Sequence, residues 1–176
     1  PKLIAIKSKL VKKENLWTKC PACHQMIFTK ELKENLFVCD NCNYHMNMPV
    51  KNRLDYIYDE NKYEEILIDK VIDDPLNFKD KVKYSDRLTK TRKKLKVNDS
   101  IKVVKGNING LKLITAAMDF RFMGGSMGMQ VGEGIVKASE EAKKMKSSLL
   151  IIASSGGARM QEGILALMQM PRTIAA

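Results

Sequence analysis

Two groups of residues in this 176-residue sequence have the types and spacing that chemistry needs: four cysteines near the N-terminus and two glycine-rich turns further along. Two residues separate Cys20 from Cys23, two separate Cys39 from Cys42, and fifteen separate the pairs. Paired Cys-x-x-Cys turns at this separation place four thiolates around a tetrahedral Zn²⁺. The sequence therefore predicts one zinc ion per chain, bound by these four cysteines.

The predicted zinc site is structural, because four protein ligands leave no position open for a substrate. Disulfides are not expected, since the sequence shows no secretory signal and thiols stay reduced inside cells. His24 and His45 lie near the cysteines but are predicted not to bind metal, since the four-cysteine set is complete. A stretch this short needs the metal in order to fold.

A pair of adjacent glycines, Gly156 and Gly157, offers a second kind of chemistry. They follow the apolar run 149–153, which is typical of a strand covered on both faces, and precede a helical pattern that Pro171 ends or kinks. We expect that helix to begin near Ala158. Glycine N–H groups at a helix N-terminus can donate to a substrate oxygen, as in an oxyanion hole. The alternative is a plain turn that needs glycine only for its backbone angle.

A similar strand, glycine turn and helix precedes this one. Gly124, Gly125 and Gly128 form its turn, and apolar residues at helical spacing follow over 131–145. Two such units in succession predict parallel strands in one sheet, with both glycine turns at the same edge. The turn lacks the G-x-G-x-x-G spacing of a dinucleotide site, and the sequence contains no P-loop motif.

The other predicted elements connect the cysteine region to these turns. They are a helix that follows Pro49 within 50–63, an exposed basic helix within 79–96, and two strands, 101–104 and 111–117, joined by a hairpin turn at Asn109-Gly110. Strands and helices in this order predict an α/β domain behind the cysteine region.

The net charge of +11 is spread along the chain, but residues 79–96 hold nine basic side chains against two acidic ones. Such a stretch is either the solvated face of a helix or a surface that attracts the phosphates of a cofactor or of nucleic acid. Without an apolar membrane span or a signal peptide, we expect an intracellular protein. The chain starts at Pro1 without a methionine and stops inside a predicted helix, so we expect a fragment.

Four features follow one another in a specific order. They are the four-cysteine region, the run from Asn109-Gly110 to Asp119, the turn Phe122-Met-Gly-Gly-Ser-Met-Gly128, and the turn Ser154-Ser-Gly-Gly-Ala-Arg-Met-Gln-Glu-Gly163. In this order they resemble the beta subunits of the carboxyltransferase component of multisubunit acetyl-CoA carboxylases, through nearly the whole chain. The resemblance implies an α/β protein with a four-cysteine zinc ribbon and basic lead-in over residues 1–50. A crotonase-like β-β-α spiral domain, incomplete at its C-terminus, is implied over 51–176.

The resemblance also implies an activity and partners. Beta subunits of this family transfer the carboxyl group from carboxybiotin, carried on a biotin carboxyl carrier protein, to acetyl-CoA, which gives malonyl-CoA for fatty acid synthesis. An alpha subunit of related fold supplies much of the biotin site, in a heterotetramer of two alpha and two beta subunits, and biotin carboxylase belongs to the wider complex. The implied location is the cytoplasm, or the plastid stroma in a plastid-bearing source.

The resemblance implies roles for particular residues as well. Gly156 and Gly157 correspond to catalytic donors that stabilise the negative charge formed on the thioester oxygen of acetyl-CoA. Substrate-binding roles are implied for Gly124, Gly125, Ala158 and Arg159. The base is expected to be the biotin ureido group after it loses CO₂. From the residues alone, Glu162 is an alternative base, but it is expected instead to cap or to pair within the helix that follows the second glycine turn.

Two other classes of protein stay open as alternatives. The first is a nucleic-acid-binding zinc-ribbon protein, which the positive charge and the aromatic residues of 17–44 favour. That class does not explain two glycine turns at one sheet edge. The second is another acyl-CoA enzyme of crotonase type, such as a hydratase. A hydratase is expected to carry acidic residues at the turns, where only Glu162 is near.

Overall fold

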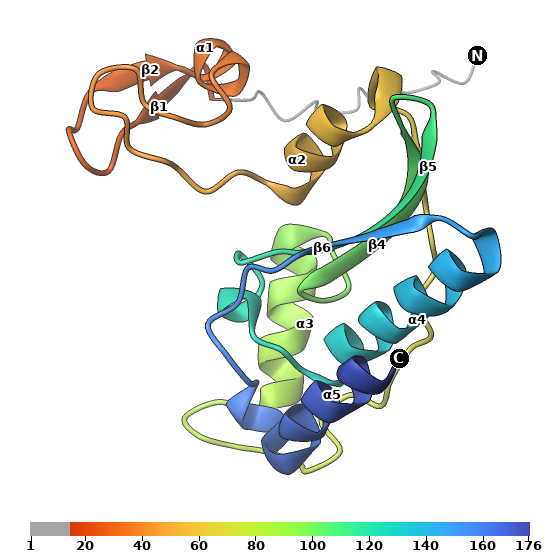
Figure 1. Ribbon diagram of the computed structural model, residues 1–176. Coiled ribbons are helices and arrows are strands. Elements are labelled where there is room, and N and C mark those ends of the chain that lie inside the picture. The colour runs from red at the N-terminus through yellow and green to blue at the C-terminus, as the bar shows by residue number, and fades with distance from the viewer. Residues whose placement is uncertain (1–14) are drawn as a thin grey trace, which may run out of the picture. The chain divides into compact units, whose positions relative to one another are not determined.

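The computed structural model describes residues 15–176, which divide into two units: one ends at Met48 and the other spans Pro49–Ala176 (Figure 1). In the first unit, β1 (Trp17–Lys19) pairs antiparallel with β2 (Met26–Phe28), and the short helix α1 (Thr29–Glu34) follows. Its buried apolar residues are few, and two of them are cysteines: Cys20, Ile27, Leu32, Phe37 and Cys39.

The second unit is built on one four-stranded sheet in the order β3-β4-β5-β6. The strands are β3 (Tyr63–Glu65), β4 (Ile101–Ile108), β5 (Leu111–Met118) and β6 (Ser148–Ile152). Strand β4 is antiparallel to both β3 and β5, whereas β6 runs parallel to β5. The predicted parallel strands of the two strand-turn-helix units are therefore confirmed.

The turn between β4 and β5 is the predicted hairpin turn. Asn109 and Gly110 have φ angles of 49° and 76°, which is the left-handed pair that a two-residue type I′ turn requires. The Asp59 carboxylate accepts hydrogen bonds from both amides at 2.9 Å. Pairing continues up to Ile108 opposite Leu111, so β4 is longer than predicted.

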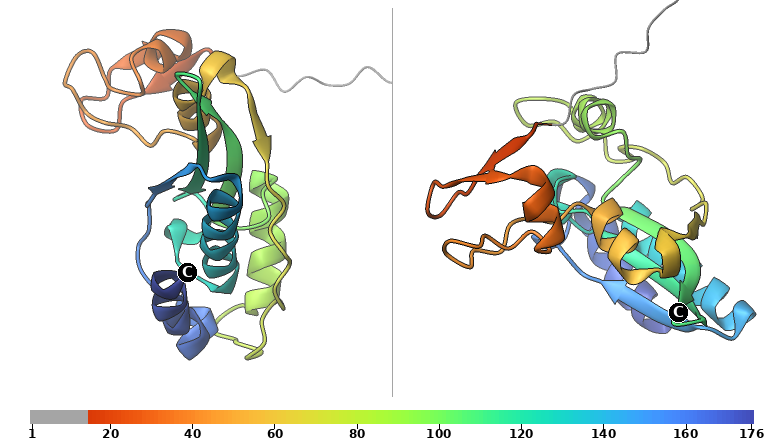
Figure 2. Two further views of the ribbon diagram at one scale, coloured as in Figure 1. Left: turned by 45° about the vertical axis from the view of Figure 1, so that its right-hand side comes forward. Right: turned by 90° about the horizontal axis from the view of Figure 1, so that it is seen from above.

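Helices cover both faces of the sheet (Figure 2). On one face, Val103 and Ile114 pack against α4 (Met129–Met145). On the other face, Val104 and its neighbours pack against α2 (Val50–Ile57). Strand β5 contributes to both faces and is buried from Leu113 to Met118, so it forms the centre of the unit.

The remaining helices lie near the ends of the strands. Helix α3 (Tyr84–Leu95) confirms the predicted basic helix, although Tyr84 and Leu88 within it are buried. Short 3₁₀ turns are η1 (Asp59–Asn61), η2 (Met123–Gly125) and η3 (Met160–Glu162), and the last helix is α5 (Gly163–Ala175). Within residues 15–176, no helix has both the length and the apolar composition that a membrane crossing needs.

Two predictions about these elements are wrong. Strand β6 is not covered on both faces: it is the last strand of the sheet, and Ile151 is 45% exposed. The last helix begins at Gly163 rather than near Ala158, because Arg159 has an extended backbone that turns its side chain into the protein. The predicted helix after Pro49 is confirmed: α2 begins at Val50 and ends at Ile57, before η1 and β3.

Candidate functional site

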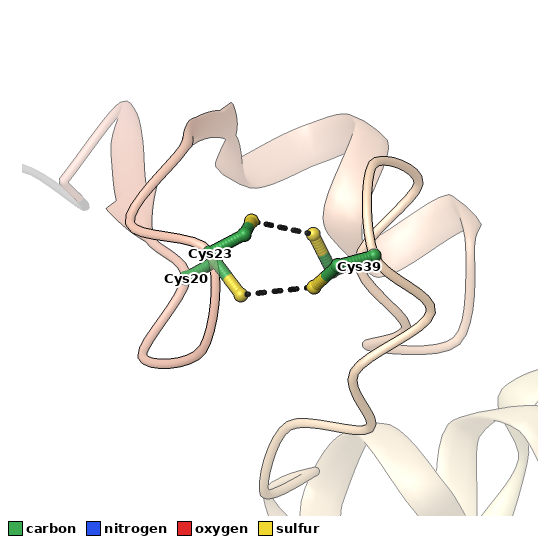
Figure 3. A group of neighbouring side chains, drawn as sticks. Cys20, Cys23 and Cys39 are labelled. Carbon is green, nitrogen blue, oxygen red and sulfur yellow. Dashed lines mark hydrogen bonds between the residues drawn. The ribbon is translucent and has the colours of Figure 1, made fainter.

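The four cysteine sulfur atoms converge from two separate loops and lie within 4.8 Å of one another (Figure 3). The Sγ atoms of Cys20 and Cys42 are 3.7 Å apart, as are those of Cys23 and Cys39. A zinc ion with four Zn–S bonds of about 2.3 Å requires sulfur atoms about 3.8 Å apart, so the spacing fits tetrahedral zinc. The cluster contains neither histidine, as predicted.

The pKa values of two thiols in this cluster are shifted by their surroundings. Hydrogen bonding by Asn41 lowers the pKa of Cys23 to about 6, which favours the thiolate that zinc binds. Cys42 accepts a hydrogen bond from the Tyr44 amide, which lowers its pKa, but burial and the neighbouring sulfurs outweigh that bond and raise it to about 12. Metal binding displaces such protons, because zinc requires all four ligands as thiolates.

The two glycine turns of the second unit lie side by side and are joined through their main chains. The Met127 N–H donates to Gly157 O at 2.8 Å, and the Arg159 N–H donates to Met127 O at 2.9 Å. These two bonds form a parallel bridge between Met127 and Ala158. Both turns therefore meet at one sheet edge, as the sequence predicted.

Two of the glycines are required by this close approach. Gly125 has a φ of +64°, and a Cβ there would lie 1.9 Å from the Ser154 carbonyl oxygen, so no side chain fits. Gly157 has a φ of +113°, which side chains rarely adopt, and nothing lies within 4 Å of where its Cβ would be. The first glycine thus allows the turns to touch, and the second leaves open space beside its own backbone.

The two predicted oxyanion donors differ in their present partners. The Gly156 N–H donates to Gly124 O at 2.9 Å, so this amide joins the two turns. The Gly157 N–H donates to the exposed Ser155 hydroxyl at 3.1 Å. Rotation about the Cα–Cβ bond of Ser155 moves this acceptor away and frees the N–H. Neither amide lies at a helix N-terminus, since α5 begins at Gly163, so the predicted position of these glycines at the start of that helix is wrong.

Arg159 lies inside the protein, with 1% of its surface exposed. Its guanidinium donates to both oxygens of Asp99, at 2.5 and 2.9 Å, and to the Ser126 carbonyl at 2.9 Å. Burial alone lowers the pKa of Arg159, but Asp99 outweighs burial and raises it. The Arg159 guanidinium thus has only internal partners and is not exposed for the predicted substrate contact.

Glu162 belongs to the same buried group. One of its oxygens accepts from the Tyr84 hydroxyl at 2.6 Å and from Arg159 at 3.3 Å. The other accepts from the Met129 N–H at 2.6 Å and so caps the N-terminus of α4. The predicted pairing is confirmed by the bond from Arg159, whereas the predicted capping is wrong, because the helix that Glu162 caps is α4 rather than its own. Sequence reasoning missed Tyr84 and Asp99, because both are distant in the chain.

A cavity of about 500 Å³ adjoins the two turns. Its lining includes Thr91 and Lys94 of α3, Arg121 and Ser126 from around the first turn, and Ala158 and Gln161 from around the second. Arg121 forms a salt bridge with Asp119, whereas the salt bridges of the described residues do not include Lys94. The cavity therefore offers a cation and hydroxyl groups to a ligand, and Gly157 directly precedes Ala158 of its lining.

Residues 68–176 match the family described as the carboxyl transferase domain. This chain belongs to that family. Residues 17–42 match a second family, described as the acetyl-CoA carboxylase zinc finger domain. The second match covers all four cysteines, and the first covers both glycine turns, so the two sites belong to separate family modules.

Several curated relatives share the name acetyl-coenzyme A carboxylase carboxyl transferase subunit beta. The relative from Bartonella tribocorum is 49% identical over all 176 residues, and the chain covers 58% of that protein. The relative from Allorhizobium ampelinum is 50% identical over 163 residues, which are 93% of the chain and 53% of the relative. The chain thus spans a little over half the length of these relatives.

Solved structures agree on the fold. Transcarboxylase 12S, crystallised with methylmalonyl-coenzyme A and methylmalonic acid bound, is 25% identical with a TM-score of 0.53 over 72% of this chain and 22% of that one. The beta subunit of P. aeruginosa geranyl-CoA carboxylase is 14% identical with a TM-score of 0.51 over 84% of this chain and 26% of that one. The protein therefore has a zinc ribbon followed by a crotonase-like carboxyltransferase fold, as the sequence predicted.

Proposed function

We propose that this protein transfers a carboxyl group from carboxybiotin, held on a carrier protein, to acetyl-CoA, and that malonyl-CoA is the product. Membership of the carboxyl transferase family and relatives of 49% and 50% identity named as acetyl-CoA carboxylase subunits support the proposal. The structural observation that carries it is the Gly157 N–H, which lies at an open turn next to the cavity and has only a rotatable hydroxyl as its partner.

The chemistry needs a donor at this position. Removal of a proton from the acetyl methyl group leaves negative charge on the thioester oxygen, and a fixed N–H aimed at that oxygen lowers the barrier. When Ser155 rotates away, the Gly157 N–H is available for this role, while Gly156 stays bound to the Gly124 carbonyl. Carboxybiotin, when bound, supplies the carboxyl group and a ureido nitrogen that accepts the proton.

Lys94 is proposed to hold the phosphates of coenzyme A. Its side chain lines the cavity, and Arg87 and Arg121 in the same lining are already paired with Asp80 and Asp119. The sequence pointed to the whole basic stretch 79–96 as a candidate phosphate surface. We restrict the proposal to Lys94, because Lys94 lines the cavity and Lys93 is not among the lining residues.

The substitution Lys94→Glu tests the phosphate contact in the full-length protein assembled with its partners. We expect the KM for acetyl-CoA to rise about 10-fold or more at low ionic strength, and this increase to shrink as salt screens the charges. Lys93→Glu is the matched control, because it changes the same charge on the same helix outside the cavity. Equal KM values for the two variants would show that this stretch is a solvated surface.

The proposed partners are a carboxyltransferase alpha subunit, in a complex of two alpha and two beta subunits, the biotin carboxyl carrier protein, and biotin carboxylase. The family and the relatives' subunit name support a multisubunit assembly. Mass spectrometry of the complex purified from its native source tests this proposal. A related alpha chain and a biotinylated carrier are expected, and nucleic acid as the sole partner would instead favour the zinc-ribbon alternative.

A further inference from the structure

The side chain of Arg159 joins parts of the second unit that are far apart in the sequence. Besides Asp99, its guanidinium contacts the Ser100 hydroxyl at 3.0 Å, the Ser126 hydroxyl at 3.0 Å and the Tyr84 hydroxyl at 3.2 Å. Its partners come from α3, from the residues before β4, and from the first glycine turn. Arg159 itself lies just after the second glycine turn, so one side chain ties all of these segments together.

The contact with Ser126 bears directly on the proposed oxyanion donor. Arg159 donates to the Ser126 carbonyl, which belongs to the peptide group that carries the Met127 N–H. That N–H donates to Gly157 O, and the Gly156 N–H donates to the first turn as well. The backbone on both sides of the Gly157 N–H is therefore held by the first turn, and Arg159 holds the first turn.

The buried polar groups around Arg159 all have hydrogen-bond partners. Asp99 accepts two hydrogen bonds from the guanidinium, and the second carboxylate, Glu162, accepts from the Tyr84 hydroxyl and from the N-terminal amide of α4. Within residues 15–176, the only buried side-chain polar atom without a partner is Ser147 Oγ. A fully satisfied polar network in a low-dielectric interior is rigid, which suits it to hold a backbone donor in place.

We propose that Arg159 is a positioning residue: through Ser126 and Met127 it fixes the direction of the Gly157 N–H, and it does not touch the substrate. This inference rests on the proposed function of that N–H. Lysine cannot replace arginine here, since one ammonium group cannot bind Asp99 with two parallel bonds and reach the Ser126 carbonyl at the same time.

The test is Arg159→Lys in the full-length protein assembled with its partner subunits. Misplacement of a catalytic group by about 1 Å costs about 10²-fold, so we expect kcat to fall by about that factor while the KM for acetyl-CoA stays within a few-fold. Hydrogen exchange of the peptide that contains Gly157 is expected to become faster. Arg172→Lys is the matched control, because Arg172 forms an exposed ion pair with Glu133, and it is expected to behave like wild type.

The outcomes separate the two proposals. A wild-type complex without carboxyl transfer to acetyl-CoA overturns the proposed function, whatever Arg159→Lys does. An active wild type together with an Arg159→Lys variant of unchanged kcat and exchange overturns the positioning role alone. A variant that raises KM and leaves kcat unchanged also overturns it, because that pattern indicates substrate binding.

If Arg159→Lys does not fold, the variant Ser100→Ala tests the positioning role in its place. The Ser100 hydroxyl donates to the Ser126 carbonyl at 3.1 Å and accepts from Arg159, and it does not line the cavity. Loss of such buried hydrogen bonds is expected to lower kcat about 3- to 10-fold with KM unchanged. A wild-type kcat in Ser100→Ala overturns the positioning role.

Discussion

The two units of this chain maintain their folds in different ways. In the first unit, two of the five buried apolar residues are the predicted zinc ligands Cys20 and Cys39, so the core and the metal site share residues. In the second unit, apolar clusters fill both faces of a sheet, and the polar network of Arg159 is made by other residues. We therefore expect the fold of the first unit to depend on one zinc ion. In the second unit, the residues of the apolar core and those of the candidate site are different residues.

The largest expected effect comes from breaking the metal site. Cys39→Ser removes one ligand, and because a structural zinc ion contributes about 10–16 kcal/mol to such a fold, we expect the first unit to unfold. The zinc content should fall from about one per chain to near zero. Trp17, the only tryptophan, should lose its contact with the Phe28 ring, which changes its fluorescence, while the amides of β5 stay protected from exchange.

The matched variant in the second unit is Ile114→Ala. Ile114 is fully buried between the sheet and α4, so its truncation is expected to cost about 2–5 kcal/mol in the second unit and leave zinc binding unchanged. The claim that the two units maintain their folds in different ways is contradicted if Cys39→Ser exposes the amides of β5 to exchange or if Ile114→Ala releases zinc.

A smaller effect concerns pH and belongs to the second unit alone. Burial raises the pKa of Asp119, but the hydrogen bonds from Arg121 outweigh burial and hold the pKa below its usual value. A lowered folded pKa means that this pair stabilises the protein above the unfolded pKa of about 3.9, and that the contribution is lost as pH falls through the folded pKa.

Thermal unfolding followed from pH 7 to pH 2 measures this contribution. Asp119→Asn is expected to lower the melting temperature of the second unit at pH 7, and the difference from wild type is expected to vanish in acid. A difference between the two proteins that is constant across the pH range would show that the Asp119 carboxylate does not supply it.

The parts of the structure that could be predicted from the sequence depend on residues close together in the chain. The cysteine ligands are two pairs at fixed spacing, and the Asn109-Gly110 turn is specified by two adjacent residues. The parallel arrangement of β5 and β6 followed from two successive strand-turn-helix patterns. In each case the deciding information was local or periodic.

The parts that could not be predicted depend on distant contacts. The late start of α5 follows from the burial of Arg159 against Asp99, which lies 60 residues earlier in the chain. The hydrogen bond from the Gly156 N–H to Gly124 O, which leaves Gly157 as the available donor, joins two turns whose distance no local pattern gives. Tyr84 is buried although it lies in a basic stretch, because one side of the otherwise exposed helix α3 faces the core.

The measurement that tests the central claim most directly replaces Gly157 by glycolic acid in the semisynthetic full-length protein, assembled with its partners. This ester exchanges the N–H for an oxygen and keeps the φ of +113°, which proline cannot adopt. The same exchange at Gly110, in the distant hairpin, is the control. We predict that kcat for carboxyl transfer to acetyl-CoA falls about 10²- to 10³-fold at position 157, with KM little changed, and stays near wild type at position 110. A kcat within a few-fold of wild type at position 157 would contradict the assignment of this N–H as the oxyanion donor.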